Sequence, residues 1–159
     1  MQVDIAVCLP RDAETVTLLR GMVANALSAF GVTRECVDDI RLALSEACTN
    51  VIQHAAADDE YEVRLEIDER CCAISVANTG HGFDAAALAG VMPDVGSPRG
   101  RGVAIMRALM DWVDFSTEPE TGTIVRLVKV LSFDPEALLA RLRGRHANAI
   151  GAATAPGPV

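Results

Sequence analysis

The chain is poor in aromatic residues: Phe, Trp and Tyr make up 4% of its 159 residues, although half of the residues are hydrophobic. Its core must therefore consist mainly of Val, Leu, Ile and Ala. The chain also lacks an excess of basic residues, since its net charge is −8. General nucleic-acid binders and proteins that dock on anionic membranes need a basic surface, so both classes are disfavoured. The net charge does not exclude a local binding site for an anionic small ligand.

Long apolar runs are also missing. The N-terminal stretch Met1–Cys8 has no basic lead and no apolar segment of spanning length, so we expect neither a signal peptide nor a transmembrane helix. We therefore expect a cytoplasmic protein. One domain is the natural expectation at this length, and no internal repeat is visible.

The cysteines form no metal-binding or disulfide pattern. Their number is odd and no pair has the spacing of metal ligands. Two of them are adjacent in a strand-like segment, so their side chains should face opposite sides of a sheet. We expect buried free thiols in a reducing compartment rather than a metal or redox centre. The five residues are Cys8, Cys36, Cys48, Cys71 and Cys72.

Hydrophobic periodicity predicts partly segregated strands and helices. Such an order favours an α+β fold: a two-layer sandwich whose mostly antiparallel sheet is covered on one face by helices. We expect residues 1–143 to form the domain and residues 144–159, rich in Ala, Gly and Pro, to form a disordered tail. In chain order we predict a strand over 2–9, helices over 14–30 and 33–56, strands over 62–68 and 71–77, a helix over 103–110, strands over 112–118 and 123–131, and a helix over 135–143.

The first of these helices should present one apolar face to the core. Its hydrophobic residues recur at helical spacing, and Gly31 should end it. The residues expected on that face are Leu18, Leu19, Met22, Val23, Ala26, Leu27 and Phe30.

The second helix carries three polar residues in a row. Glu46, Asn50 and His54 are four residues apart, which places them on one side of a helix. Glu46 can take a proton from a hydroxyl or a water, and the carbonyl oxygen of Asn50 is a hard ligand suited to Mg²⁺. An apolar stripe of Leu44, Cys48, Val51 and Ala55 lies on another side. By itself the polar row also fits an ordinary solvated helix face.

Two glycine-rich turns follow. The first, Ala77–Asp84, comes directly after a strand, and its spaced glycines let the backbone turn sharply and approach a ligand. The second, Gly96–Gly102, directly precedes a helix, where exposed backbone N–H groups suit phosphate and Arg99 adds positive charge. The chain lacks the Gly-Lys-Ser/Thr of a P-loop and the parallel strand–turn–helix unit of a dinucleotide fingerprint.

The polar helix row, the strand-end turn and the phosphate-type turn occur in an order that resembles the GHKL ATPases, which have the Bergerat ATP-binding fold. Within them the chain is most similar to the anti-sigma-factor serine kinases of the sporulation and general-stress type. The resemblance spans about residues 10–131, and its most specific matches are Asp39–Asn50 and Gly100–Met106. The segment between the two glycine turns is short, as in these kinases.

The resemblance implies a role for each matching residue. Glu46 matches the general base that activates the attacking hydroxyl, and Asn50 matches the Mg²⁺ ligand that bridges the triphosphate. His54 matches a polar position near the nucleotide. Further positions match the adenine-side turn, the phosphate-side lid and a strand threonine that helps to bind the base; in chain order they are Gly80, Gly82, Gly100, Arg101, Gly102, Val103 and Thr123.

Arg20 lies on the first predicted helix, where similar kinases use an arginine to dock the sigma factor and its antagonist. An ordinary exposed helix charge is an equally good interpretation of this residue.

One position departs from the family. The family has Asp at the start of the strand-end turn, where its carboxylate accepts a hydrogen bond from the adenine amino group, whereas this chain has Asn78. An Asn carbonyl can still accept that hydrogen bond, but without the strength that a charge adds, and its NH₂ group can instead donate to a keto oxygen. We therefore expect altered nucleotide affinity and base selectivity.

The resemblance implies an ATP- and Mg²⁺-dependent serine/threonine kinase that sequesters a sigma factor and phosphorylates a small antagonist protein, with no direct contact to nucleic acid or membrane. The alternative is a catalytically weak nucleotide-binding switch that regulates by docking alone. Retention of Glu46 favours the kinase, and Asn78 favours the switch. A purely structural domain with chance glycines is a third interpretation. The oligomeric state is open, with a homodimer as one option.

Overall fold

A computed structural model of the chain describes residues 2–54, 60–78, 98–118 and 122–137. The predicted tail from residue 144 and the turn that contains Gly80 and Gly82 lie outside the described residues. The described helices and strands are, in chain order, β1 (Val3–Pro10), α1 (Ala13–Ala29), α2 (Arg34–His54), β2 (Glu60–Ile67), β3 (Cys71–Asn78), α4 (Pro98–Leu109), β4 (Trp112–Glu118) and β5 (Gly122–Val130).

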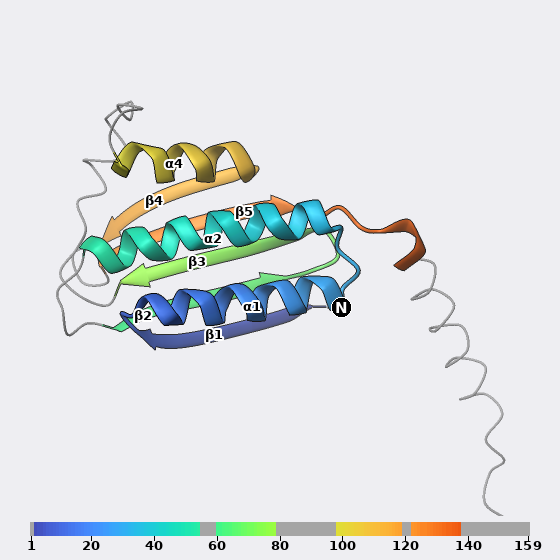
Figure 1. The fold of residues 1–159 in the computed structure, drawn as a ribbon, viewed down its shortest axis with the longest axis horizontal. Helices are drawn as coiled ribbons and strands as arrows, with labels where there is room; N and C mark the ends of the chain where they lie inside the picture. The colour runs from blue at the N-terminus through green and yellow to red at the C-terminus, as the bar shows by residue number, and fades with distance from the viewer. Residues whose placement is uncertain (1, 55–59, 79–97, 119–121, 138–159) are drawn as a thin grey trace, which may run out of the picture.

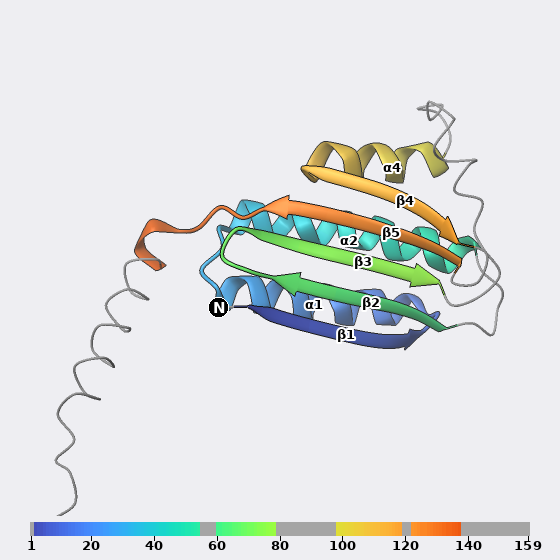
Figure 2. The same ribbon diagram turned by 180° about the vertical axis from the view of Figure 1, so that it is seen from behind.

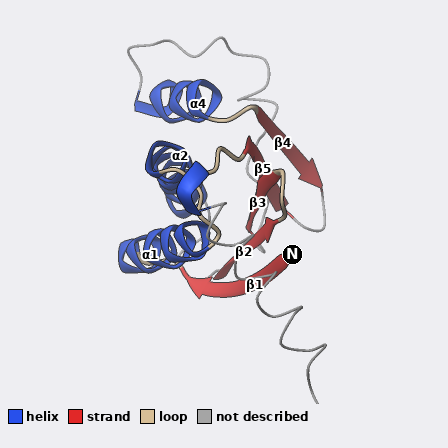
Figure 3. Cartoon of the chain, turned by 90° about the vertical axis from the view of Figure 1, so that its right-hand side faces the viewer, coloured by secondary structure: helices blue, strands red, loops and turns tan. Residues whose placement is uncertain are grey.

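The strands form one antiparallel sheet of five in the order β1-β2-β3-β5-β4. All three helices lie on one face of this sheet, with α2 between α1 and α4 (Figures 1 and 3). From behind, no described helix covers the strands (Figure 2). This arrangement confirms the predicted α+β sandwich with helices on one face.

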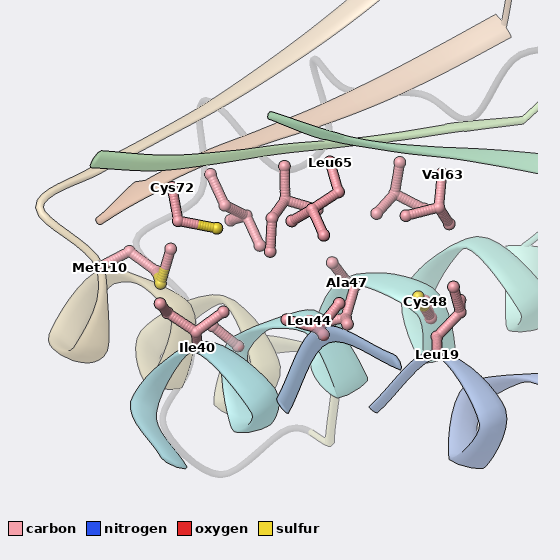
Figure 4. Close-up of a cluster of buried hydrophobic side chains, with 14 of the residues drawn as sticks. Leu19, Ile40, Leu44, Ala47, Cys48, Val63, Leu65, Cys72 and Met110 are labelled. Carbon is pink, nitrogen blue, oxygen red and sulfur yellow. The ribbon is translucent and has the colours of Figure 1, made fainter. Parts of the chain in front are cut away.

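The core fills the space between the sheet and the helices (Figure 4). Strand β2 shows how the sequence places it there: alternate residues are buried against the helices, while Glu62, Arg64 and Glu66 point to the open face. The largest fully buried side chains are mostly aliphatic, as the composition predicts; they are Tyr61, Leu19, Leu27, Ile40, Leu44, Ile67, Ile74, Met106, Leu127, Val23, Val76 and Val125.

Helix α1 begins and ends close to where the sequence places it. The side chain of Asp12 accepts a hydrogen bond from the backbone N–H of Glu14 at 2.9 Å, and Gly31 leaves the helix with φ 77°. The predicted apolar face is only partly right, because Leu18 is 57% exposed and Met22 37% exposed. The buried stripe runs through Leu19, Val23 and Leu27, and both exposed residues precede a member of that stripe by one position, which turns them about 100° away from the core.

Helix α4 begins earlier than predicted. The predicted helix starts at Val103, after the glycines, whereas the observed helix starts at Pro98 and includes Gly100 and Gly102. Proline is favourable in the first helical turn, because its fixed φ suits a helix and its missing N–H would have no partner there. The glycines therefore belong to the helix N-terminus rather than to a loop in front of it.

The last predicted helix begins as expected. Residues 135–137 are helical, and the side chain of Asp134 accepts a hydrogen bond from the N–H of Glu136 at 2.8 Å. The remainder of the predicted span, 138–143, lies outside the described residues. Among the described helices, none is long and apolar enough to span a membrane.

All five cysteines are free thiols, as predicted. Cys71 and Cys72 face opposite sides of the sheet, because only Cys72 is fully buried. The expectation that all thiols are buried is wrong for Cys8, which is exposed on the open face of the edge strand β1, and for Cys71, which is only partly buried. Burial raises the pKa of Cys48 to about 12, because the thiolate would lose its hydration in the core.

This burial predicts a loss of stability at high pH. The unfolded Cys48 thiol should ionise near its ordinary pKa of about 8.5, while the folded thiol keeps its proton. The unfolded state then binds fewer protons, so the free energy of unfolding should fall between about pH 9 and pH 11 by up to about 1.4 kcal/mol per pH unit for this one group. Cys48→Ala should reduce the slope by that amount in urea unfolding measured over the pH range. The two curves should run parallel below pH 7; parallel curves at alkaline pH as well would contradict the assignment.

Candidate functional site

The predicted site residues gather at one end of the molecule. The C-terminal end of α2, the N-terminal end of α4, the end of β3 and the start of β5 all lie at the left of Figure 1. Antiparallel pairing brings the last two together, since Ala77 of β3 pairs with Ile124 of β5. The next residues along the two strands, Asn78 at the end of β3 and Thr123 near the start of β5, therefore have adjacent backbones at this end of the sheet.

Glu46 and Asn50 of α2 meet Gly102 of α4. A Cβ atom placed on Gly102 would lie 2.9 Å from Glu46 Oε2, 3.6 Å from Asn50 Oδ1 and 3.7 Å from Asn50 Nδ2. The first of these distances is too short for any real side chain. The glycine therefore lets the backbone of α4 approach the carboxylate and the carboxamide at the same time, and any side chain here would require the Glu46 carboxylate to shift.

Asn50 has hydrogen-bonding capacity that the described part of the chain does not use. Its Nδ2 atom is buried and has no partner among the described residues. An unpaired buried amide normally costs free energy, so such a group in a native structure indicates a missing partner. Because Oδ1 and Nδ2 can be exchanged by a flip of the amide, Asn50 can present either an acceptor to a cation or a donor to a phosphate oxygen.

The donor set fits Mg²⁺ held together with a triphosphate. Among the described residues no cluster of three or more His, Cys, Asp or Glu side chains could hold a metal ion by itself. Mg²⁺ does not need such a cluster, because it usually keeps several waters and binds one or two protein oxygens plus phosphate. Asn50 offers one such oxygen, beside the Glu46 carboxylate and the backbone of Gly102.

The lid residues of the resemblance divide into exposed and buried ones. Arg101 is exposed, whereas Gly100 and Gly102 are buried. Val103 is 2% exposed, so its side chain belongs to the core. The backbone N–H groups in the first turn of a helix have no partner within it and carry positive potential, which suits an anion.

Other predicted residues are placed by backbone alone. His54 is the last residue of α2, Asn78 is the last of β3 and pairs with Tyr61, and Thr123 pairs with Thr117. The structure describes the backbones of His54, Asn78 and Thr123 but not their side chains. Gly80 and Gly82 lie outside the described residues altogether. Arg20 is exposed on α1, and α2 separates it from α4 (Figure 3).

Sequence reasoning missed the contacts that hold the two site helices in place. Lys129 of β5 donates to Asp39 Oδ2 of α2 at 3.0 Å and to the carbonyl of Leu109, the last residue of α4, at 2.5 Å. Burial lowers the pKa of Lys129, but the hydrogen bond to Asp39 and the charges of Asp39 and Asp111 outweigh burial, and the pKa is raised overall. No local pattern marks a strand lysine as the partner of two helices.

A second missed contact joins the start of α1 to the end of α2. Arg11 donates to the carbonyl of Val51 at 2.9 Å and to that of Ile52 at 2.5 Å. Arg11 is 40 residues from Val51 in sequence, so only the tertiary fold brings them together.

Comparisons with known proteins give the class. Residues 9–129 match the family described as the histidine kinase-like ATPase domain. The match covers most of the chain, which therefore belongs to the histidine kinase-like ATPases, and the predicted membership of the GHKL group is confirmed.

Several curated relatives are serine-protein kinases. The serine-protein kinase RsbW of Bacillus velezensis is 32% identical over 138 residues, which cover 78% of this chain and 83% of the relative. RsbW of Bacillus subtilis is 31% identical over 138 residues, with the same coverage. RsbW of Bacillus cereus is 30% identical over 133 residues, which cover 77% of this chain and 82% of the relative. The resemblance to anti-sigma-factor serine kinases is thereby confirmed.

The close contact at Gly102 predicts a measurable coupling to Glu46. In a helix, Gly→Ala normally stabilises by about 0.5–1 kcal/mol, and Gly21→Ala on α1 should do so, because a Cβ there has nothing within 4 Å. Gly102→Ala should gain less or destabilise, since the Glu46 carboxylate must move. In a Glu46→Ala background the same change should become more favourable by at least about 0.5 kcal/mol. Urea unfolding of the four variants measures this coupling. Equal effects of Gly102→Ala in both backgrounds would contradict the close packing.

Proposed function

We propose that the chain is an ATP- and Mg²⁺-dependent serine/threonine protein kinase that acts as an anti-sigma factor in the cytoplasm. It would sequester a sigma factor and phosphorylate a small antagonist protein. The observation that supports this proposal is the meeting of Glu46, Asn50 and Gly102, which lie together although α2 and α4 are far apart in sequence. The similarity to serine-protein kinases over most of the chain supports the same conclusion.

Each residue has a distinct task in the proposed reaction. The Glu46 carboxylate would accept the proton of the attacking hydroxyl as its oxygen bonds to the γ-phosphorus of ATP, while the bond from that phosphorus to the bridging oxygen breaks and ADP leaves with the electron pair. Asn50 holds Mg²⁺ by its carbonyl oxygen, and the cation when bound neutralises charge on the phosphates. The N-terminus of α4 offers backbone N–H groups to the phosphates, and the exposed Arg101 adds a positive charge. Positioning and charge neutralisation together carry phosphoryl transfer.

The variant Glu46→Gln tests the assignment of the general base. It should keep nucleotide binding, seen as a rise in melting temperature with ATP and Mg²⁺, because a ligand selective for the native state must raise it. Phosphoryl transfer to the antagonist should fall by roughly 10²-fold or more, because the amide cannot accept the proton. Asn50→Ala is the matched variant for the metal and should remove the Mg²⁺ dependence of the melting shift. Equal losses of binding and transfer in Glu46→Gln would make Glu46 an organising group instead.

A nucleotide-binding switch with little kinase activity is the second candidate, and Asn78 favours it. The carboxamide lacks the full charge that the family's Asp brings to the adenine, so nucleotide binding loses a charge-assisted hydrogen bond. The two candidates differ in one measurement. A wild-type chain that captures its partners in a nucleotide-dependent manner but transfers no phosphate would be the switch.

Arg20 is the residue we assign to partner docking. It is exposed on α1, and α2 separates it from the site helix α4, so a partner held there would leave the N-terminus of α4 accessible. A guanidinium at this position suits carboxylates of a partner surface, which it can bind through two parallel hydrogen bonds.

Charge reversal at Arg20 should separate docking from nucleotide binding. Arg20→Glu should weaken capture of the sigma factor or the antagonist by about 10-fold or more, since it places like charges opposite each other. The melting shift with ATP and Mg²⁺ should persist. Arg34→Glu is the control, because the Arg34 side chain is 96% exposed at the start of α2 and makes only a 3.8 Å ion pair with Asp38. If both charge reversals weaken partner capture equally, the effect comes from the overall charge of the protein, and the assignment of Arg20 as a specific docking residue is wrong.

A further inference from the structure

Arg11 lies between two elements that the hydrogen-bond pattern holds firmly. It follows Pro10, the last residue of β1, and precedes Asp12, which caps α1. The backbone N–H of Asp12 donates to the carbonyl of Pro10 at 2.9 Å. The Thr15 hydroxyl donates to the carbonyl of Asp12 at 2.6 Å and shares a second hydrogen bond with the buried Tyr61 hydroxyl, also at 2.6 Å. The backbone that carries the Arg11 side chain is therefore fixed in place.

The two carbonyls that Arg11 binds lie in the last described turn of α2. In an α-helix the carbonyl of residue i accepts from the N–H of residue i+4. The described part of α2 extends to His54, so the N–H groups that would pair with Val51 and Ile52 in a longer helix lie outside the described residues. One Arg11 nitrogen donates to both of them, at 2.9 Å and 2.5 Å. Its positive charge also complements the negative end of the helix dipole.

The turn held in this way carries the site. Asn50 directly precedes Val51, and its side chain lies against Gly102 with a buried amide nitrogen that has no partner among the described residues. The ends of helices fray, and a helix end without a cap would let the Asn50 carboxamide move relative to α4. Glu46 lies one turn further from that end, where the carbonyls of α2 have partners within the helix.

We propose that Arg11 is a positioning residue for Asn50, and that it sets the affinity for Mg²⁺–nucleotide rather than the proton transfer at Glu46. This inference rests on the proposed function, because it gives Asn50 the metal-binding role. A cap that only stabilised the fold would lower the melting temperature without changing the Mg²⁺ dependence.

Three variants of the full chain test the proposal. Arg11→Gln removes the charge and shortens the donor, Arg11→Lys keeps the charge and one donor group, and Arg34→Gln is a control at a highly exposed arginine. The measurement is ATP affinity by titration calorimetry at a series of Mg²⁺ concentrations, well below the melting temperature of each variant. Arg11→Gln should raise the Mg²⁺ concentration for half-maximal binding by at least 5-fold. Arg11→Lys should recover at least half of that loss on a logarithmic scale, and Arg34→Gln should match the wild type.

Amide hydrogen exchange supplies a readout that needs no nucleotide. In Arg11→Gln the amides of residues 50–54 should exchange at least 5-fold faster, while those of residues 40–46 should stay as in the wild type. Faster exchange together with the shifted Mg²⁺ dependence supports the proposal. Unchanged exchange overturns it, and so does an unchanged Mg²⁺ dependence in a variant that only melts earlier. A wild-type chain that binds no ATP with Mg²⁺ overturns the proposed function itself, which separates the two failures.

Discussion

The close approach of α4 to α2 at Gly102 is the contact on which the site depends. Helix α2 is buried against the sheet through Leu44 and Cys48, while Glu46 and Asn50 lie beside Gly102 of α4. At that meeting point a side chain would collide with the Glu46 carboxylate. The absence of one Cβ atom thus lets a carboxylate, a carboxamide and the N-terminal half of α4 lie close together, and in the proposed reaction all three would act on the same phosphates.

Two basic residues outside the site, Arg11 and Lys129, hold its two helices in place. Both site helices end at a carbonyl that is bound by a cation from another element: Arg11 binds the end of α2, and Lys129 binds the last carbonyl of α4. Basic groups at helix C-termini satisfy carbonyls that the helix cannot pair and complement its dipole. Lys129 also binds Asp39 near the start of α2, so that one lysine on strand β5 contacts both site helices and links them to the sheet.

The sequence predicts much of this arrangement, and its failures have physical causes. The strand and helix order follows from local periodicity, and the neighbourhood of Glu46 and Asn50 follows from the helical repeat. The start of α4 is misplaced because glycine has low helix propensity, while Pro98 favours the first turn. The exposure of Leu18 and the roles of Arg11 and Lys129 depend on how elements pack, and a single sequence carries no local signal for a contact across 40 or 90 residues.

The contact of Lys129 with the C-terminal end of α4 affects the position of the other end of the helix. Its C-terminal end is held by Lys129 and followed by the buried Met110 and by Asp111, whose N–H donates to the carbonyl of Val128 at 3.0 Å. Gly102 lies about 10 Å along the helix axis from Leu109, since a helix rises by 1.5 Å per residue. A tilt of about 6° then moves Gly102 by about 1 Å, a displacement that can cost about 10²-fold in rate. In the proposed reaction, the lysine contact at the far end of α4 would therefore add to the core packing of Val103 and Met106 in keeping the reacting groups aligned.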